Sequence, residues 1–215
     1  GGGENVVLGK VAQDYLPDAD WLETRLAEAN GTRIKMVTVV NPCNPTGVIM
    51  PAALLERLKT MCERHNVWLV VDNTYENFTY EEEGCGPHTV VSGSHVVNVF
   101  SFSKAYGMMG WRVGYLAYPH SLHDELLKVQ DTIAICPSIA SQKAALAALT
   151  AGRAWVRGQV KGLAENRKVV REALEAAVGK ANVIGGTGAI YFMARLPVQD
   201  DFRVVEWLTD KHQVC

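Results

Sequence analysis

Three short apolar runs constrain the fold of this chain more than any other feature. They are rich in β-branched residues and lack polar alternation, so they predict buried strands over Ile34–Val40, Val67–Asp72 and Val96–Phe100. Between the first two, Pro51–His65 carries apolar residues at helical spacing behind an opening proline. A strand, a helix and a strand in this order form a parallel unit. We therefore expect an α/β protein with a mostly parallel sheet and helices on both faces.

The remaining segments extend this pattern and then change it. A fourth strand is expected over Val113–Ala117, and the second half is mostly helical until a late strand. The expected helices and the late strand are Asp18–Ala29, Asp124–Ile133, Ser138–Leu149, Arg153–Val178, Ala189–Leu196 (strand) and Asp200–His212. We expect residues 1–150 to form a large domain, and residues 151–215 to form a connecting helix and the start of a smaller α+β domain.

Charge and composition exclude several classes of function. The chain has 215 residues with 21 Lys and Arg against 23 Asp and Glu, and it has no basic block, so nucleic acid and acidic membrane surfaces are not expected partners. No apolar run approaches the ~20 residues that span a bilayer. Five cysteines without framework spacing favour free thiols in a reducing, cytoplasmic compartment. Small molecules or copies of the chain itself are the expected partners.

The two ends suggest an internal piece of a longer protein. There is no initiator methionine, and the last residues stop where a new apolar segment begins. We expect a larger parent.

Polar residues that could bind a ligand or react with it follow the first two strands directly. Residues 41–47 hold two Asn-Pro pairs and a glycine, which form a rigid turn that can fix side-chain amides at the sheet edge or can be an ordinary tight turn. Asp72 ends the second strand, and Tyr75 lies three residues on. A buried aspartate needs a partner, although an aspartate after a strand is commonly a helix cap.

The third strand leads into a segment that can hold a phosphate beside a reactive amine. Residues 101–115 contain hydroxyls at Ser101 and Ser103, an amine at Lys104, several glycines, and a guanidinium at Arg112. A lysine can attack a carbonyl covalently when its surroundings lower its pKa. The alternative is a glycine-rich loop with solvated charges. The presence of the two other segments in the same chain makes this alternative less favourable.

Together the three segments resemble the fold-type I pyridoxal-phosphate (PLP) enzymes of the class I/II aminotransferase family. The shared motifs are Asn-Pro-x-Asn-Pro-Thr-Gly, Asp-x-x-Tyr and Ser-x-Ser-Lys-x-x-Gly-x-x-Gly-x-Arg-x-Gly, in the family's order, with Gly-Ala-Ile-Tyr-Phe at 188–192 in support. The resemblance implies the large domain of that fold, PLP as cofactor, and a homodimer for the parent.

The resemblance also assigns roles residue by residue. Lys104 matches the lysine that forms a Schiff base with PLP and carries the substrate Cα proton, and Asp72 matches the carboxylate that pairs with the pyridinium nitrogen. Asp72, Tyr75 and Lys104 are thus the expected catalytic residues. The other matches are Asn44 and Tyr75 for the ring 3-oxygen, and Ser101, Ser103 and Arg112 for the phosphate.

The stretches around Lys104 look most like plant-type aromatic aminotransferases, which implies transfer from methionine or an aromatic amino acid such as tryptophan to a 2-oxo acid. The alternatives are a PLP-dependent C–S lyase or related Cα-bond enzyme, and a non-catalytic regulator module of the same fold.

The family's glycine-rich phosphate loop, its ring-stacking aromatic residue and its substrate-carboxylate arginine have no match here, so the isolated piece is expected to be inactive. No metal is expected, because the pairs Cys85/His88 and His120/His123 are interpreted as surface loops.

Overall fold

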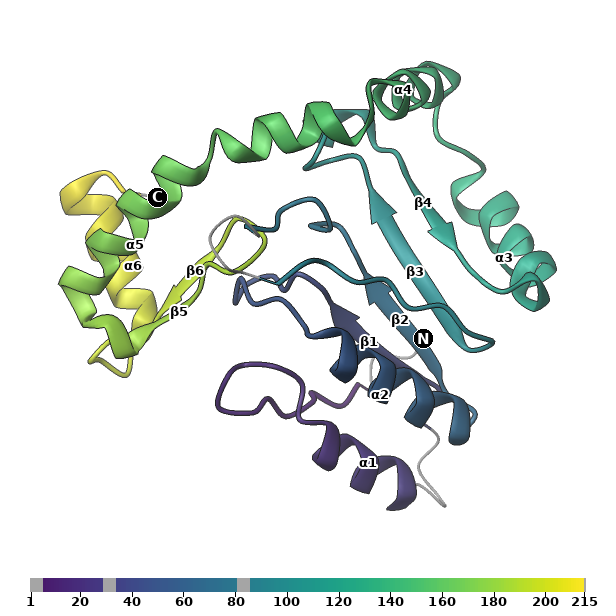
Figure 1. Ribbon diagram of the computed structural model, residues 1–215, viewed down its shortest axis with the longest axis horizontal. Coiled ribbons are helices and arrows are strands. Elements are labelled where there is room, and N and C mark those ends of the chain that lie inside the picture. Colours follow the sequence, from purple (N-terminus) through teal and green to yellow (C-terminus); the bar gives the residue numbers. More distant parts are fainter. Residues whose placement is uncertain (1–5, 29–33, 81–85, 215) are drawn as a thin grey trace.

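The chain folds around a four-stranded sheet with the order β1-β2-β3-β4 (Figure 1). The structure is a computed structural model that describes residues 6–28, 34–80 and 86–214. The strands are β1 (Met36–Val40), β2 (Trp68–Asp72), β3 (Val96–Ser101) and β4 (Gly114–Ala117). The first three run parallel and β4 runs antiparallel to β3. The α/β class, the mostly parallel sheet and all four predicted strands are confirmed.

The register aligns the carboxyl ends of the parallel strands. Val40 lies opposite Asp72, and Asp72 lies opposite Val99, so the segments that follow β1, β2 and β3 leave the sheet at the same edge. The chain then turns back into β4, where Gly114 pairs with Ser101. A Cβ at Gly114 would lie 2.6 Å from the Phe100 carbonyl oxygen, so this close return requires glycine.

Two helices cover one face of the sheet and form the main core. They are α1 (Ala19–Glu28) and α2 (Ala52–Arg64). Leu55 and Leu58 of α2 are fully buried in one cluster with Leu69 and Val71 of β2. Burial of each such side chain contributes about 1.5–3 kcal/mol, so this cluster anchors the strand that ends in Asp72.

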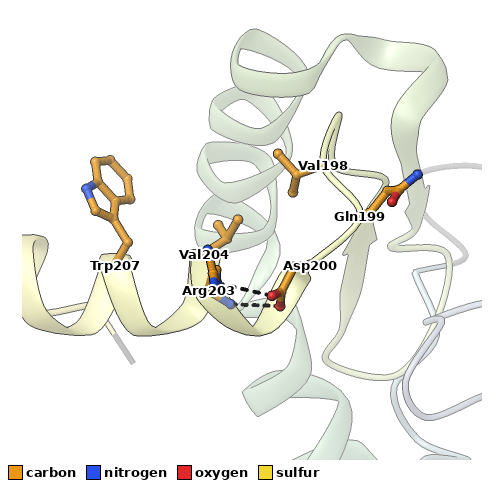
Figure 2. Close-up of a pocket in the computed structure, with 6 residues that line it drawn as sticks. All are labelled: Val198, Gln199, Asp200, Arg203, Val204 and Trp207. Atoms are coloured by element: carbon orange, nitrogen blue, oxygen red, sulfur yellow. Dashed lines mark hydrogen bonds and ion pairs between the residues drawn. The ribbon is translucent and has the colours of Figure 1, made fainter.

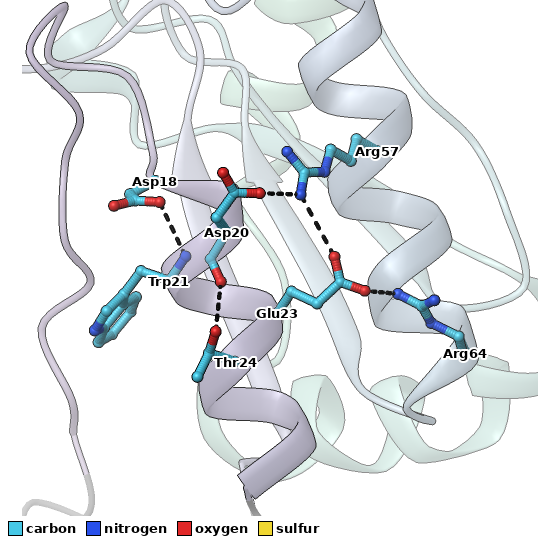
Figure 3. Close-up of polar contacts among 7 residues, drawn as sticks. All are labelled: Asp18, Asp20, Trp21, Glu23, Thr24, Arg57 and Arg64. Carbon is cyan, nitrogen blue, oxygen red and sulfur yellow. Dashed lines mark hydrogen bonds and ion pairs between the residues drawn. The ribbon is translucent and has the colours of Figure 1, made fainter.

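Ion pairs join the outer faces of α1 and α2 (Figure 3). Arg57 lies 2.5 Å from Asp20 and also contacts Glu23, which pairs with Arg64 as well. These side chains are exposed, and surface pairs of this kind contribute about 0–1 kcal/mol each. The apolar cluster beneath them therefore dominates the attachment of α1.

The second half is helical, with boundaries that differ from the prediction. The helices are α3 (His123–Val129), which continues as a π-helical turn to Ala134, α4 (Ile139–Lys161) and α5 (Ala164–Val178). Helix α4 runs past Gly152, which has non-helical dihedral angles and kinks it, whereas the predicted single helix over Arg153–Val178 is broken at Gly162. Val156 and Val160 share a buried cluster with Tyr75, and the second half of α4 lies near the strand ends (Figure 1).

A second, two-stranded sheet follows α5. It consists of β5 (Val183–Gly185) and antiparallel β6 (Phe192–Ala194), and α6 (Asp201–His212) begins after the N-cap Asp200. The late strand is shorter than the predicted Ala189–Leu196, because Ala189 instead donates its N–H to the Phe78 carbonyl at 2.9 Å. The placement of a domain boundary near residue 150 stays a prediction.

The edge strand β4 is less covered than the sequence pattern predicts. All four residues of β4 are exposed, including Tyr115 at 46% and Leu116 at 43%. Within the described ranges β4 pairs with β3 alone. No helix in the described part of the chain is long and apolar enough to span a membrane.

Candidate active site

The predicted site residues follow the aligned carboxyl ends of β1, β2 and β3. The turn after β1 is attached to β2, because Asn41 donates its N–H to the Asp72 carbonyl at 2.9 Å. Asn73 in turn donates its N–H to the Val99 carbonyl at 2.8 Å. Ligands of open α/β sheets bind at this edge, so the fold places the three chemical segments where a ligand site is expected.

Asp72 is held by its own turn through one carboxylate oxygen. Oδ1 accepts a hydrogen bond from the Thr74 backbone N–H at 2.9 Å and another from the Thr74 hydroxyl at 2.6 Å. The cap-like bond that the alternative interpretation expects is therefore present. No other hydrogen bond or ion pair of the Asp72 carboxylate occurs in the described part of the chain, so its second oxygen is available to a ligand. The sequence did not predict this role of Thr74, because its only signal was a hydroxyl two residues after the aspartate.

Tyr75 is a buried phenol in contact with a second tyrosine. Its side chain is 4% exposed, and its hydroxyl meets the Tyr191 hydroxyl, with the two rings edge to face at 5.3 Å between centroids. Burial, the hydrogen bond to Tyr191 and the negative charge of Asp72 raise the pKa of Tyr75 well above its ordinary value. Tyr75 is consequently neutral at physiological pH and retains a proton to donate.

The two asparagines of the turn after β1 have different tasks. The Asn41 side chain is fully buried, and its Oδ1 accepts from the Met50 N–H at 2.8 Å, so it fixes the turn internally. Asn44 is exposed. Its amide is therefore open to a ligand, whereas Asn41 Nδ2 is buried without a hydrogen-bond partner in the described residues. The predicted role of Asn44 stays a prediction. Both Asn-Pro peptide bonds of the turn are cis.

The segment after β3 is partly assembled. Ser101 Oγ accepts from the Ser103 N–H at 3.1 Å, and both serines are half-buried. Arg112 is exposed, has a left-handed φ of 52°, and donates from Nη1 to the Met109 carbonyl at 2.8 Å. No hydrogen bond joins Arg112 to either serine in the described residues. Four further guanidinium N–H groups remain to bind an anion.

Lys104 is half-buried beside these serines. In the part of the chain that the structure describes, no hydrogen bond or ion pair engages its amine. The amine is therefore not committed to a structural role and is available for reaction with a carbonyl.

A loop from the second sheet enters this site, which the sequence did not predict. Thr187 and Gly188 donate their N–H groups to the Gly47 carbonyl at 3.1 and 2.9 Å. Gly185 has a φ of 81°, and a Cβ there would overlap the Thr46 carbonyl oxygen. The glycine run was interpreted only as a turn into a strand. The structure shows that its glycines also let two backbones touch.

The His88 side chain is half-buried and belongs to a polar network with two buried asparagines rather than being an exposed loop residue. Its Nε2 lies 2.9 Å from Asn73 Oδ1, and Asn73 Nδ2 donates to the Val71 carbonyl and to Asn98 Oδ1. This corrects the surface-loop interpretation of His88, while Cys85 lies outside the described residues. The network supports the chain immediately after Asp72.

The environment of His88 predicts an acid-sensitive stability. Burial, opposed by a hydrogen bond to the Asn41 backbone and aided by the Arg153 charge, lowers the pKa of His88 from 6.5 to about 4. The unfolded chain binds this proton near pH 6.5, so this contribution to stability is complete above that pH and is lost between about pH 6.5 and 4, by on the order of 3 kcal/mol. Urea unfolding across this window should show a flatter pH dependence for His88→Gln, whereas exposed His120→Gln should match the wild type. An equal slope in all three proteins contradicts the prediction.

A separate hollow lies at the start of α6, away from these strand ends (Figure 2). It is lined by Val198, Gln199, Asp200, Arg203, Val204 and Trp207. Asp200 and Arg203 pair with each other at 3.3 Å, so the charges of this hollow satisfy one another. The strand-end site, by contrast, contains a carboxylate oxygen and an amine without hydrogen-bond partners in the described residues.

Comparison with known proteins identifies the family. Residues 2–215 match the family described as "Aminotransferase class I and II". The chain belongs to this family. It is 51% identical to the aromatic aminotransferase ISS1 of Arabidopsis thaliana over 98% of this chain and 54% of that protein. It is 32% identical to the aspartate/prephenate aminotransferase of Thermus thermophilus over 92% of this chain and 51% of that protein.

Solved structures agree with the family assignment. An aminotransferase from Mycobacterium tuberculosis superimposes with a TM-score of 0.79 at 27% identity, covering 95% of this chain and 53% of that one. The chain therefore spans about half the length of the relatives it matches.

Aminotransferases of this family are PLP-dependent, and the residues present fit that cofactor. A carboxylate with one fixed and one available oxygen suits a pyridinium N–H. An uncommitted amine suits an aldehyde, and two half-buried hydroxyls with an arginine suit a phosphate. The described residues thus supply a partner for the nitrogen, aldehyde and phosphate of PLP.

Proposed function

We propose that this chain is the cofactor-binding half of a PLP-dependent aminotransferase. The enzyme transfers an amino group between an aromatic amino acid such as tryptophan, or methionine, and a 2-oxo acid. The observation that carries the proposal is the convergence of Asp72, Tyr75 and Lys104 on one edge of the sheet in a chain of the aminotransferase family. The 51% identity to a protein named as an aromatic aminotransferase supports the substrate class.

The catalytic residues would act as follows. PLP, when bound, supplies an electron sink for the bonds at the substrate Cα. Lys104 would hold the cofactor through Nζ and, as a free amine, would take the proton from the substrate Cα. Asp72 would keep the ring nitrogen protonated through its available oxygen. Tyr75 would donate its phenolic proton to the ring 3-oxygen, together with the Asn44 amide.

The remaining residues would bind and orient. Ser101 and Ser103 would donate their hydroxyl protons to the phosphate, and Arg112 would donate from the guanidinium N–H groups that the Met109 carbonyl does not use. Charge-assisted hydrogen bonds contribute about 1.5–3 kcal/mol each, so these three side chains account for much of the cofactor affinity.

Product analysis of the full-length protein that contains this chain tests the function. The protein is loaded with PLP and given tryptophan or methionine with phenylpyruvate. We expect phenylalanine to form in equal amount to the 2-oxo acid of the donor. Ammonia without a new amino acid would instead establish elimination, as in a C–S lyase, and absence of both products would leave the regulator module as the better account.

We further propose that the full-length protein is a cytoplasmic homodimer. Apolar side chains that are exposed here support a covered surface, among them Ile139 at 70%, Leu146 at 66% and Trp155 at 46% on α4. Free cysteines at positions 43, 62 and 136 support a reducing compartment. Light scattering after size-exclusion chromatography should give twice the monomer mass, and a fluorescent fusion should fill the cytoplasm.

A further inference from the structure

The loop between β5 and β6 is fixed to the strand-end site just before Tyr191. Gly188 bonds to the Gly47 carbonyl, Ala189 donates to the Phe78 carbonyl at 2.9 Å, and the Tyr80 hydroxyl donates to the Ala189 carbonyl at 2.7 Å. Ala189 is fully buried. The backbone that carries Tyr191 is therefore held in place by three bonds to the segments that follow β1 and β2.

Tyr191 also packs directly on the turn after β1. Gly47 has a φ of 68°, and a Cβ there would overlap the Tyr191 carbonyl oxygen. The side chain extends from this anchored point to the Tyr75 hydroxyl, with an interplanar angle of 76° between the rings. The contact joins residues 116 positions apart in the chain.

We propose that Tyr191 is a positioning residue that donates its hydroxyl proton to Tyr75 and thereby directs the Tyr75 proton toward the cofactor 3-oxygen. The inference rests on the proposed function. A phenol donates one hydrogen bond and accepts others, so only one of the two phenolic protons lies in the hydrogen bond between two contacting phenols. When Tyr191 donates that proton, the proton of Tyr75 is left for a third group. The accepted bond also polarises the Tyr75 O–H and makes it a stronger donor.

Loss of the Tyr191 hydroxyl should then change how tightly Lys104 Nζ holds its proton. A weaker donor at Tyr75 leaves more negative charge on the 3-oxygen, and that charge holds the proton on the linked Nζ more tightly. The pH midpoint at which the visible absorbance of the Lys104-linked cofactor changes should rise. A net hydrogen bond of typical strength corresponds to about 0.5–1 pH unit.

The experiment compares five PLP-loaded forms of the full-length protein: wild type, Tyr191→Phe, Tyr75→Phe, the double variant and Tyr15→Phe. We expect a midpoint raised by about 0.5–1 pH unit in Tyr191→Phe and raised further in Tyr75→Phe. The double variant should not exceed Tyr75→Phe, because Tyr191 acts through Tyr75. Tyr15→Phe is the matched control, since the Tyr15 hydroxyl accepts a 2.8 Å bond from Arg195 after β6 but lies outside the site.

The outcomes separate this inference from the function on which it rests. A wild-type midpoint in Tyr191→Phe, an equal change in Tyr15→Phe, or additive changes in the double variant each overturn the role of Tyr191 while PLP still binds. A wild type that does not link PLP at Lys104 overturns the proposed function and the inference with it. Incorporation of 3-fluorotyrosine at position 191, a stronger donor of nearly the same shape, provides a second route with the opposite sign, because it should lower the midpoint.

Discussion

Lys104→Ala is expected to abolish covalent capture of PLP. Borohydride reduction of the wild type should fix the cofactor on the peptide that contains residue 104, and the variant should bind PLP reversibly without fixing any. The physical reason is that Lys104 alone among the predicted site residues offers a primary amine, which lies half-buried beside Ser101 and Ser103 and is uncommitted to any bond in the described residues. Absorbance spectra and peptide mass mapping after reduction measure the effect.

Amino transfer by the same variant should fall by at least about 10³-fold, because general acid–base catalysis alone contributes 10²–10⁴-fold and the anchoring amine is also lost. Lys143→Ala, which removes an exposed lysine of α4, is the control and should leave capture and turnover at wild-type levels. Capture of PLP by the Lys104 variant at another lysine, with turnover preserved, would show that the assignment is wrong.

Asp72→Asn should weaken PLP binding by roughly 10- to 100-fold, the loss expected for one charge-assisted hydrogen bond of about 1.5–3 kcal/mol. Turnover should fall more than binding, since the carboxylate also keeps a proton on the ring nitrogen during the reaction. Asparagine retains an oxygen that accepts from the Thr74 N–H and hydroxyl, so the local turn survives and only the negative charge is removed. Fluorimetric PLP titration and steady-state rates give the two quantities.

This substitution distinguishes the two interpretations of Asp72. If the residue were only a cap of its turn, asparagine would replace it without effect on PLP. Asp18→Asn is the matched control, because Asp18 Oδ1 accepts from the Trp21 N–H at 2.9 Å at the start of α1, far along the chain from the strand ends. Unchanged PLP affinity in the Asp72 variant would reduce Asp72 to a structural residue.

The predicted strands and the site edge were accessible from the sequence for one reason. Each chemical segment begins within a residue or two of a β-branched run, and parallel strands bring their carboxyl ends to one edge. The sequence alone thus predicted that Asp72 lies beside the turn at 41–47. The individual roles of the site residues stay predictions that the variants above test.

Other features depend on contacts that no local pattern encodes. The exposure of β4, the break at Gly162 and the polar network of His88 follow from which surfaces meet, and helical periodicity or a lone histidine does not specify that. The division of work between Asn41 and Asn44 likewise depends on which amide the turn rotates inward.

The sequence by itself determined the α/β class, the family resemblance and the candidate residues Asp72, Tyr75 and Lys104, because these depend on local composition and on spacing along the chain. Only the tertiary structure decided that Thr74 restrains Asp72 and that Tyr191 reaches Tyr75. The second contact joins two sheets across 116 positions. It exists because the glycines of the loop at 185–188 let that loop lie directly on the turn after β1, a proximity that burial and backbone packing create in three dimensions.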